Sequence, residues 1–388
     1  LIQVPEVSHQ ENNKVIGVAG AGCNAINNMI AHAMQSHGVA FISANTDAQV
    51  LKHSRADNAV QLGAELTKGF GAGCNPEIGR QAAEEDRERI AELITGADLL
   101  FITAGMGGGT GTGAAPVIAQ VAREKGILTV GVVTKPGLDE GGRQKVAQTG
   151  IDELARYVDS LIVVSNQKLE EVLGDDVTID EAFRAADDVL RNAVGSIVEI
   201  IQYPGLINVD FADVKTVMRE MGMAMMGSAH ASGPDRAIRA TEEAIRCPLL
   251  DNISFKGARG VLVNFSTAPG KLKKSETRQA LEIIESHVAD GALVKHGVVY
   301  DEALGEDEIR VTLVATGLGG KAINTPSLTV VSSQTLKTGT DNVAYEEAYD
   351  TPAIWRNNRG NRAPEAAARP AMSNIDMDIP AFLRRQAD

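Results

Sequence analysis

The sequence predicts an α/β fold in which helices cover both faces of a mainly parallel sheet, with a smaller α+β domain and a disordered tail behind it. Three observations predict it. Short apolar runs alternate with helical patterns in the first half, as is typical of buried parallel strands. One helical pattern near the middle spans about 25 residues, roughly 37 Å. Sustained periodicity ends after residue 318, which is typical of a disordered segment.

The first domain, residues 14–177, follows a polar N-terminal segment, residues 1–13, that we expect to be flexible. Apolar runs predict strands at residues 14–19, 39–43, 99–103, 127–133 and 160–164. Apolar residues spaced by three or four predict helices between them, at residues 26–34, 80–94 and 114–125. This alternation predicts parallel strands joined by helical crossovers.

A long central helix is predicted over residues 178–204. Thr178-Ile-Asp-Glu181 matches a capping box, in which two side chains satisfy the first free backbone N–H groups. Apolar residues then keep three- and four-residue spacing as far as Ile201, and Pro204-Gly205 ends the pattern. Such a helix is long enough to run the depth of one domain and meet a second.

The second domain, residues 205–318, has an α+β pattern. Its predicted helices are residues 213–226, 236–246 and 275–289, and its predicted strands are residues 260–266, 293–300 and 309–315. Methionines are concentrated between residues 218 and 226. We favour adaptable core packing for them over a promiscuous binding face.

The C-terminal part divides into a linker and a terminal peptide. Residues 319–374 are rich in small and polar residues and predict a disordered linker. In the terminal peptide, residues 375–388, Asp378-Ile-Pro380 can start a short helix that carries Phe382 and Leu383. An apolar cluster there favours a binding partner, and the alternative is a frayed terminus without function.

Composition narrows the function classes. The net charge of −14 argues against nucleic-acid partners and anionic lipid. Cys23, Cys74 and Cys247 form no CxxC pair, which predicts a reducing, cytoplasmic compartment without structural zinc. The polar start lacks a secretory pattern, and no apolar run is long enough for direct membrane insertion. Any membrane link is therefore expected to be indirect.

A glycine-rich loop, Gly105-Met-Gly-Gly-Gly-Thr-Gly-Thr-Gly113, lies between a predicted strand and a predicted helix. Without Cβ atoms, its backbone N–H groups can approach a polyanion at the start of a helix. No Lys-Ser or Lys-Thr pair follows, so it is not a Walker A loop. We interpret it as a phosphate cradle, and the alternative is a flexible linker. Because an acidic protein repels a triphosphate, a divalent cation such as Mg²⁺ is expected with it.

A second glycine loop leaves a rival interpretation open. Gly20-Ala-Gly22-Cys-Asn-Ala25 follows the first strand and satisfies the dinucleotide fingerprint, which predicts an NAD-dependent oxidoreductase. Against it, Asp47 sits within Asn-Thr-Asp instead of standing alone as a ribose anchor, and the loop at 105–113 has no role in a dinucleotide half-site. A third turn at residues 69–76 favours a pocket that surrounds a triphosphate.

Four segments, residues 69–80, 103–116, 182–190 and 205–226, resemble the FtsZ family, the bacterial relatives of tubulin. The resemblance covers about residues 14–318, and residues 378–385 resemble the tail of proteobacterial members. It implies a tubulin-like fold with a Rossmann-like GTP-binding domain, and a GTPase that polymerises head to tail into the cytokinetic ring at mid-cell. It also implies that residues 375–388 bind membrane-tethering adaptors such as FtsA or ZipA.

The resemblance assigns residues to GTP or GDP. Glu140 would hold the ribose, Arg143 would approach the phosphates, and Thr110 could offer its hydroxyl to phosphate or Mg²⁺. The residues that would surround the phosphates are Gly20, Ala21, Gly22, Cys23, Asn24, Gly71, Ala72, Gly107, Gly108, Gly109, Thr110 and Gly111.

The same resemblance assigns guanine to Asn166, Phe183 and Asp187, with Phe183 against the ring and Asp187 accepting from its N–H donors. Local alternatives remain for two of them. Phe183 fits a core position of the long helix, and Asp187 fits a solvated acid beside Asp188.

The segment Asn208-Val-Asp210-Phe-Ala-Asp213 has two interpretations. Local rules make Asp210 a helix N-cap and Asp213 a favourable first-turn acid. The resemblance instead places Asn208, Asp210 and Asp213 in the nucleotide site of the next subunit, where the carboxylates orient the attacking water. Apart from the hydroxyl that Thr110 could offer to Mg²⁺, no metal ligand is assigned to a protein side chain.

Several residues depart from the family pattern. Ala19, Ala21 and Cys23 replace glycines, and each side chain could crowd the phosphates or oppose a positive φ. Ser165 replaces a common proline, residues 135–140 lack the usual aromatic residues, and Arg143 follows Glu140 one residue early. These departures leave a third possibility, a GTP-binding filament protein with impaired turnover.

Overall fold

The computed structural model describes residues 12–32, 34, 38–137, 140–174, 177–202, 205–207, 209–220, 222–246, 255, 257–301 and 304–318. The expectations for most of the N-terminal segment, for Asn208, and for the linker and terminal peptide at 319–388 lie outside the described residues. Within the described part, no helix combines the length and apolarity needed to cross a membrane.

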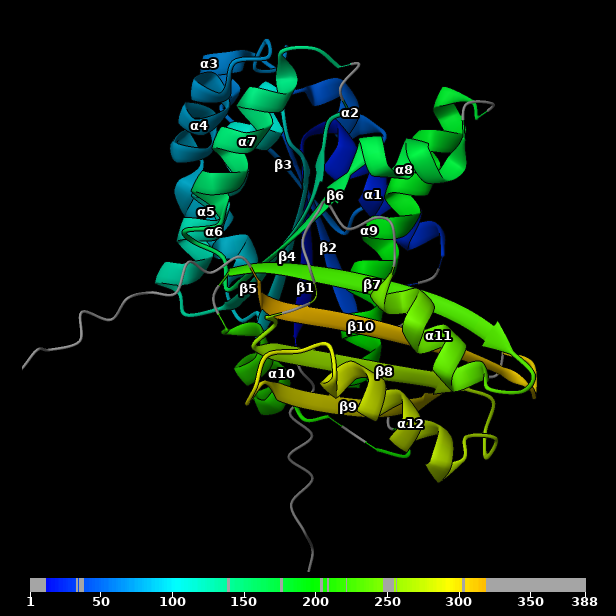
Figure 1. Cartoon of the computed structure of the whole chain (residues 1–388). Coiled ribbons are helices and arrows are strands. Elements are labelled where there is room, and N and C mark those ends of the chain that lie inside the picture. Colours follow the sequence, from blue (N-terminus) through cyan, green and yellow to red (C-terminus); the bar gives the residue numbers. More distant parts are fainter. Residues whose placement is uncertain are drawn as a thin grey trace, which may run out of the picture. The chain divides into compact units, whose positions relative to one another are not determined.

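The described strands form one ten-stranded sheet in the order β3-β2-β1-β4-β5-β6-β7-β10-β8-β9 (Figure 1). Neighbours from β3 to β7 are parallel, whereas β10 is antiparallel to both β7 and β8. The strands are β1 (Asn13–Val18), β2 (Val39–Asn45), β3 (Asn58–Gln61), β4 (Leu99–Gly105), β5 (Leu128–Lys135), β6 (Ser160–Ser165), β7 (Gly222–Ser232), β8 (Gly260–Thr267), β9 (Leu293–Tyr300) and β10 (Glu308–Leu318).

Helices cover both faces of the first half of the sheet. The described helices are α1 (Ala19–Ala31), α2 (Ala48–Lys52), α3 (Ala64–Thr67), α4 (Pro76–Glu85), α5 (Arg87–Ile94), α6 (Gly109–Glu124), α7 (Arg143–Leu154), α8 (Asn166–Leu173), α9 (Ile179–Gln202), α10 (Phe211–Met218), α11 (Arg236–Ile245) and α12 (Lys274–Glu285). One apolar core packs α4 to α7 on one face, and a second packs α1, α9 and α10 on the other (Figure 1). A third core lies under α11 and α12.

The two predicted domains share this single sheet. β6 and β7 pair in parallel through three residue pairs, from Ser160–Gly222 to Ile162–Ala224. The Ser160 hydroxyl also donates to the Met218 carbonyl at 2.8 Å. The parallel sheet of the first half therefore continues into the second half without a break, which the sequence pattern alone does not indicate.

The prediction for the central helix is confirmed. The Thr178 N–H donates to the Glu181 carboxylate at 3.0 Å, and the Glu181 N–H donates to the Thr178 hydroxyl at 3.3 Å. These are the two bonds of a capping box. The helix α9 follows as far as Gln202, and its apolar stripe lies in the second core.

The predicted helix at residues 213–226 is wrong in its second half. Here α10 ends at Met218, and β7 begins at Gly222, whose φ of 145° is open to glycine alone. Met225 and Met226 are buried in β7, which pairs with β10. Their burial confirms core packing for these methionines. The helical spacing failed because long-range strand pairing overrides local propensity.

Other boundaries differ for local reasons. The predicted helix at residues 80–94 is two helices, separated at Asp86, whose carboxylate accepts from the Gly63 N–H at 2.7 Å. The helix predicted from residue 114 begins at Gly109, because the last glycines of the loop are helical. The pattern also missed β3, α2, α3, α7 and α8, which are short or weakly apolar.

Glycines allow α4 and α6 to pack at unusually short range. A Cβ on Gly113 would overlap the Pro76 carbonyl oxygen, and one on Gly79 would overlap the Gly109 carbonyl oxygen. These contacts are backbone to backbone, so no side chain can move aside. Part of the glycine-rich loop therefore serves helix packing instead of phosphate binding.

We expect Gly113→Ala to lower stability by about 1–3 kcal/mol, or more if the helices cannot separate. Thermal unfolding with nucleotide absent measures the loss. The matched control is Gly142→Ala, because a Cβ there meets nothing within 4 Å and φ is −65°. Equal melting temperatures for the two variants would contradict the packing argument.

Candidate functional site

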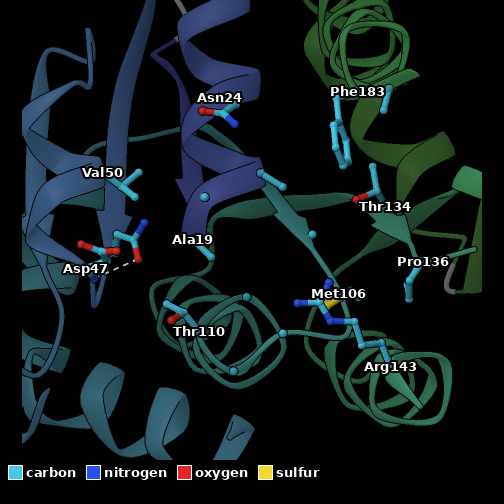
Figure 2. Close-up of a pocket in the computed structure, with 18 of the residues that line it drawn as sticks. Ala19, Asn24, Asp47, Val50, Met106, Thr110, Thr134, Pro136, Arg143 and Phe183 are labelled. Atoms are coloured by element: carbon cyan, nitrogen blue, oxygen red, sulfur yellow. Dashed lines mark hydrogen bonds between the residues drawn. The ribbon is translucent and has the colours of Figure 1, made fainter. Parts of the chain in front are cut away.

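A cavity of about 610 Å³ lies at the carboxyl ends of the parallel strands. Val18 pairs with Ala104, and Gly105 pairs with Thr134, so β1, β4 and β5 end at one edge of the sheet. Figure 2 shows side chains from α1, α6, α7 and α9 around this cavity. Ligands of open α/β sheets bind at such an edge, as the glycine loops predict.

Most of the predicted nucleotide residues meet at this cavity. Those that line it are Gly20, Ala21, Asn24, Gly71, Gly108, Gly109, Thr110, Gly111, Glu140, Arg143, Asn166, Phe183 and Asp187. The predicted residues that are not among its lining residues are Gly22, Cys23, Ala72 and Gly107.

The N-termini of α1 and α6 both meet the cavity. Gly20 and Gly108 line it, and a Cβ built on either meets nothing within 4 Å. The backbone there faces open space. Two helix N-termini of this kind place free N–H groups and partial positive charge where an anion can bind.

Two glycine-loop residues pack inward instead. A Cβ on Gly22 would overlap the Thr103 carbonyl oxygen, so this glycine lets α1 approach β4. Cys23 is buried behind α1, and its Sγ lies 3.9 Å from the Gly17 carbonyl oxygen. Burial raises the pKa of Cys23 to about 11. Its side chain therefore belongs to the core and does not crowd the cavity.

Ala19 has a strained backbone. It lies at the start of α1 with φ of +65°, a left-handed conformation that an L side chain adopts at a cost of about 1–2 kcal/mol. An alanine at this position is expected to oppose a positive φ, and the chain adopts that φ nevertheless. The surrounding structure therefore holds the phosphate loop in this shape against a local penalty.

At the far side of the cavity, α9 contributes Phe183 and Asp187. The Phe183 ring is 60% exposed and extends from α9 toward the cavity (Figure 2). The alternative that it is a core residue is therefore wrong. Burial, and then the nearby Asp188 charge, raise the pKa of Asp187 to about 6. An acid held this far out of water favours a ligand that donates hydrogen bonds to it.

Glu140, Arg143 and Asn166 form a polar chain in the lining of the cavity. The Glu140 carboxylate accepts from Arg143 Nη1 at 3.1 Å and from Asn166 Nδ2 at 3.4 Å. Within the described part, Asn166 Oδ1 is buried without a hydrogen-bond partner. Arg143 reaches the cavity despite its early position in the sequence, because it starts α7.

The residues at the end of β2 also line the cavity, and the sequence patterns did not predict this. Thr46 lines the cavity, and its hydroxyl lies 2.6 Å from that of Thr110. Asn45 also lines the cavity and is 3% exposed, and its Nδ2 has no partner among the described residues. Asp47, considered above as a ribose anchor, caps α2 by accepting from the Gln49 N–H at 2.8 Å. Asn45 and Thr46 lie at the end of a buried strand, and this position is the feature of the sequence that could have indicated their place in the cavity.

Further residues line the cavity without having been assigned individually to the nucleotide. They are Ala19, Val50, Cys74, Gly105, Met106, Thr134, Pro136, Ala186 and Leu190. Ala19, Cys74, Gly105 and Met106 belong to or adjoin the glycine-rich segments, whereas no local motif marks the other five. Only the folded chain brings them to this edge.

The acids at the start of α10 lie away from the cavity. The Asp210 carboxylate accepts from the Asp213 N–H at 2.7 Å, which confirms the N-cap interpretation. Asp213 also forms an ion pair with Lys295 at 2.8 Å. From Phe183, α9 runs to Gln202, roughly 30 Å along the helix axis, before the chain reaches these acids. Figure 1 shows α10 at the opposite end of α9 from α8. One molecule therefore does not bring its acids to its own cavity.

Comparisons with known proteins agree with the fold and the glycine loops. The model of the Tubulin/FtsZ family GTPase domain matches residues 12–174, and that of the FtsZ family C-terminal domain matches residues 222–319. Cell division protein FtsZ of Neisseria meningitidis serogroup A is 52% identical over 379 residues, covering 96% of this chain and 94% of the relative. That of Azotobacter vinelandii is 52% identical over 385 residues, covering 97% and 96%.

Solved structures of related proteins have a similar fold. An empty FtsZ dimer from M. jannaschii superposes with a TM-score of 0.74 at 41% identity, covering 79% of this chain and 88% of that one. CetZ2 from Haloferax volcanii, described as a GTPγS-bound protofilament, has a TM-score of 0.68 at 22% identity, covering 79% and 93%. At that identity the second likeness shows the fold alone.

Proposed function

This chain belongs to the FtsZ family of tubulin-like cell-division GTPases, and we propose that consecutive subunits of a head-to-tail filament build its catalytic site together. Membership in a GTPase family overturns the NAD-dependent oxidoreductase alternative. The observation that carries the proposal is the separation of the cavity from the acids of α10 along α9. A second copy that stacks on the first would bring its acids to that cavity.

The cavity fits a guanine nucleotide. Gly20 and Gly108 leave open space at two helix N-termini, which suits the phosphates. The unpartnered Asn45 Nδ2 and Asn166 Oδ1 atoms and the half-buried Asp187 carboxylate supply the remaining polar contacts. In this proposal, Asp187 accepts from the base, Phe183 lies against its ring, and Glu140 holds the ribose.

Mg²⁺ would be held mainly by phosphate oxygens. The described residues offer no cluster of three or more His, Cys, Asp or Glu that could bind a metal ion by themselves. The Thr46 and Thr110 hydroxyls lie at the phosphate end and could complete its shell. When bound, the ion would neutralise charge on the phosphates.

We assign water orientation to Asp210 and Asp213 of the adjacent subunit, with Asn208 as a third polar group on the same loop. Phosphoryl transfer requires a positioned water more than covalent chemistry. The N-cap bond occupies one lone pair of Asp210 and leaves others free to accept from water. The Lys295 ammonium holds Asp213 at the rim of α10. Capping and catalysis are therefore compatible.

A contact between unlike ends has a consequence for assembly. Such a heterologous interface does not close on itself and generates an open filament. Turnover then requires assembly, and loss of the γ-phosphate weakens the contact that enabled it. We propose that these filaments form the cytokinetic ring at mid-cell.

Phosphate release and light scattering, each measured with GTP and Mg²⁺ against protein concentration, test the proposal. We expect both signals to rise together above a critical concentration. Scattering without phosphate release would instead support the impaired-turnover possibility raised by Ala19 and Ala21. Turnover per molecule that does not change on dilution would contradict the shared site.

We further propose that residues 375–388 bind membrane-tethering adaptors such as FtsA or ZipA. Deleting them should leave critical concentration and turnover unchanged and abolish recruitment to vesicles that carry the adaptor. The matched control deletes an equal length from the linker, residues 340–353, and should keep recruitment. A tail-less protein that is still recruited would contradict this role.

A further inference from the structure

We propose that Lys295 is a further catalytic residue of the shared site, whose ammonium group binds the γ-phosphate of GTP in the cavity of the neighbouring subunit. The inference rests on the proposed function, which takes only acids and one amide from the neighbour. It adds a positive charge that is carried by the same end of the subunit as Asp210 and Asp213.

The described lining of the nucleotide cavity carries more negative than positive charge. Its acids are Asp47, Glu140 and Asp187, and Arg143 is its one Lys or Arg side chain. Arg143 also pairs with Glu140 at 3.1 Å, so its charge is shared with an acid. Apart from Arg143, the positive charge available to a triphosphate here comes from the two helix N-termini and from Mg²⁺.

The proposed docking of a neighbour makes this imbalance larger. Asp210 and Asp213 then approach the γ-phosphate, and like charges at short distance repel each other. Phosphoryl transfer depends on positive charge near the oxygens of the transferred group, and a basic side chain from a second subunit can supply it. A cation that arrives together with the acids would offset their repulsion and stabilise the transition state.

Lys295 has the position that this role requires. Its Nζ lies 2.8 Å from Asp213 Oδ1, and in the part of the chain that the structure describes it is the one basic side chain that forms an ion pair with an acid of α10. Its backbone is fixed, because it is in register with Leu262 in a parallel ladder that includes every residue of β9. Acid and ammonium are therefore presented together.

The alternation of side chains along β9 directs Lys295 toward α10. Leu293 packs with residues of α10 in the second core, whereas His296 and Val298 line a cavity next to α12 on the opposite face of the strand. Lys295 is two residues from Leu293 and shares its face. The ammonium group is thus directed to the acids and not into the cavity next to α12.

The ammonium group can also reach the phosphate. A carboxylate that orients the attacking water is one hydrogen bond away from it, and that water lies about 3–3.5 Å from the phosphorus. The Lys295 side chain is 35% exposed and has a flexible four-carbon stem. Rotation of this stem can therefore move Nζ from Asp213 to a γ-phosphate oxygen while β9 stays in place.

Substitution at Lys295 tests the charge. Lys295→Met keeps an unbranched side chain without the charge, and we expect it to reduce turnover per assembled subunit by roughly 10²–10³-fold. Lys295→Arg keeps the charge and should stay within about tenfold of the native rate. Phosphate release above the critical concentration measures both. Native turnover in filaments of Lys295→Met would overturn the proposal.

Two controls exclude indirect effects of Lys295→Met. GTP affinity below the critical concentration should not change, because Lys295 is not among the residues that line its own cavity. The melting temperature should change little, because both side chains of the ion pair with Asp213 are about one-third exposed. A loss of turnover that is fully matched by a loss of GTP affinity would overturn the proposal.

A double variant separates contact with phosphate from a role in holding Asp213. If Lys295 acts only through its ion pair, adding Lys295→Met to Asp213→Asn should cause no further loss, because the acid is already gone. We expect instead a further loss of about tenfold or more in the residual turnover of the filaments, measured with GTP labelled at the γ-phosphate. Equal turnover in the single variant Asp213→Asn and the double variant would overturn the proposal.

Chemical labelling measures the proximity directly. In an acyl-phosphate derivative of GTP, a lysine amine near the terminal phosphate attacks the acyl carbon. An amide forms, the bond from that carbon to the phosphate oxygen breaks, and GTP leaves with the electron pair while the amine loses a proton to water. Filaments assembled from GTP with a fraction of this derivative should carry the label on Lys295, and protein below the critical concentration should not.

Lys215 is the matched control for the labelling. It lies on α10, but its Nζ is 6.0 Å from the centre of the Phe211 ring and has no place at the phosphate in this proposal. Peptide mass spectrometry compares the two lysines. Equal labelling of Lys215 and Lys295, or no assembly-dependent label on Lys295, would overturn the proposal.

Mixtures of variants distinguish failure of this inference from failure of the proposed function. Lys295→Met and Asp187→Ala damage opposite ends of the subunit, so their mixture should recover turnover, whereas Lys295→Met mixed with Asp213→Asn should not. Assembly-dependent turnover in the native protein together with native turnover in Lys295→Met would overturn the inference and leave the shared acids intact. Native turnover per molecule that does not depend on protein concentration would overturn both.

Discussion

An Asp213→Asn variant is expected to bind GTP as tightly as the native protein and to lose roughly 10²–10⁴-fold of its assembly-dependent turnover. The reason is that, in the proposed filament, its acid orients water in the neighbour's cavity, whereas Asp213 is not among the residues that line its own cavity. Phosphate release above the critical concentration and nucleotide binding below it separate the two quantities. Equal losses in both would contradict the role across subunits.

A change in folding stability would not account for this loss of turnover in Asp213→Asn. Asp213 and Lys295 form their ion pair with both side chains about one-third exposed, so water screens the pair and its contribution to folding is small. Asp210→Asn supplies a matched comparison, because Asn is as good an N-cap as Asp but carries no charge. We expect it to keep the melting temperature and to lose turnover. Asp210→Ala should lose turnover and also about 1 kcal/mol of stability.

Turnover measured in mixtures of two variants tests the shared site directly. Asp213→Asn keeps its cavity, whereas Asp187→Ala damages the cavity and keeps its acids. A mixture should recover part of the native turnover, because some interfaces then join an intact cavity to intact acids. Two variants that damage the same partner, such as Asp210→Asn with Asp213→Asn, should not recover it. Recovery in neither mixture would contradict a shared site.

Asp187→Asn is expected to weaken GTP binding roughly 100-fold or more and to shift preference toward xanthosine triphosphate. Guanine offers two N–H donors to the carboxylate, and each bond to a charged acceptor contributes about 1.5–3 kcal/mol. An Asn amide meets one of those donors with a donor of its own. Xanthine has a carbonyl in place of the amino group, so the amide can pair with it. Competition binding with the two nucleotides measures the shift.

The pH dependence of binding gives a second signature of the same acid. In the empty cavity, burial raises the pKa of Asp187 to about 6. Base donors favour the ionised form, so bound nucleotide lowers that pKa. GTP affinity should therefore be constant above pH 6 and decrease as the pH falls through 6. Asp187→Asn should abolish this dependence.

The adjacent acid provides the control. Asp188 accepts from Asn28 at 3.2 Å and pairs with Arg191 at 3.0 Å, away from the cavity lining. Asp188→Asn should retain both guanine preference and the loss of affinity below pH 6, with a slightly lower midpoint because one negative charge beside Asp187 is gone. If Asp187→Asn and Asp188→Asn had the same effect on nucleotide preference and on its pH dependence, Asp187 would not contact the base.

The folding stability of the nucleotide-free protein changes with pH in the direction opposite to the GTP affinity. A folded-state pKa raised above the unfolded value contributes stability that is present at low pH and is lost as the pH rises through about 6. The ionised Asp187 is therefore a local cost to the empty fold at pH 7.5. The cavity keeps an acid that destabilises the empty site, as expected where function and stability conflict.

Much of the site could be predicted from local sequence, because phosphate loops are runs of neighbouring residues at strand ends. Gly20 and the run from Gly108 to Gly111 line the cavity as the two loops predict, and Asp210 caps α10 as its local pattern predicts. Prediction failed where a residue's role depends on what packs against it. Gly22 and Gly113 carry the same local signal as Gly20 and Gly108, yet they pack on backbone. Asn45 and Thr46 carried no motif at all.

The sequence by itself determined the alternation of strands and helices, the start of α9 at its capping box and the cap at Asp210, because each depends on consecutive residues. Only the tertiary structure decided that β6 and β7 unite both halves in one sheet, that residues 222–226 pair as a strand, and that Cys23 faces the core. It also placed the acids a helix length away from the cavity. These features depend on contacts between residues far apart in the chain, which no local pattern records.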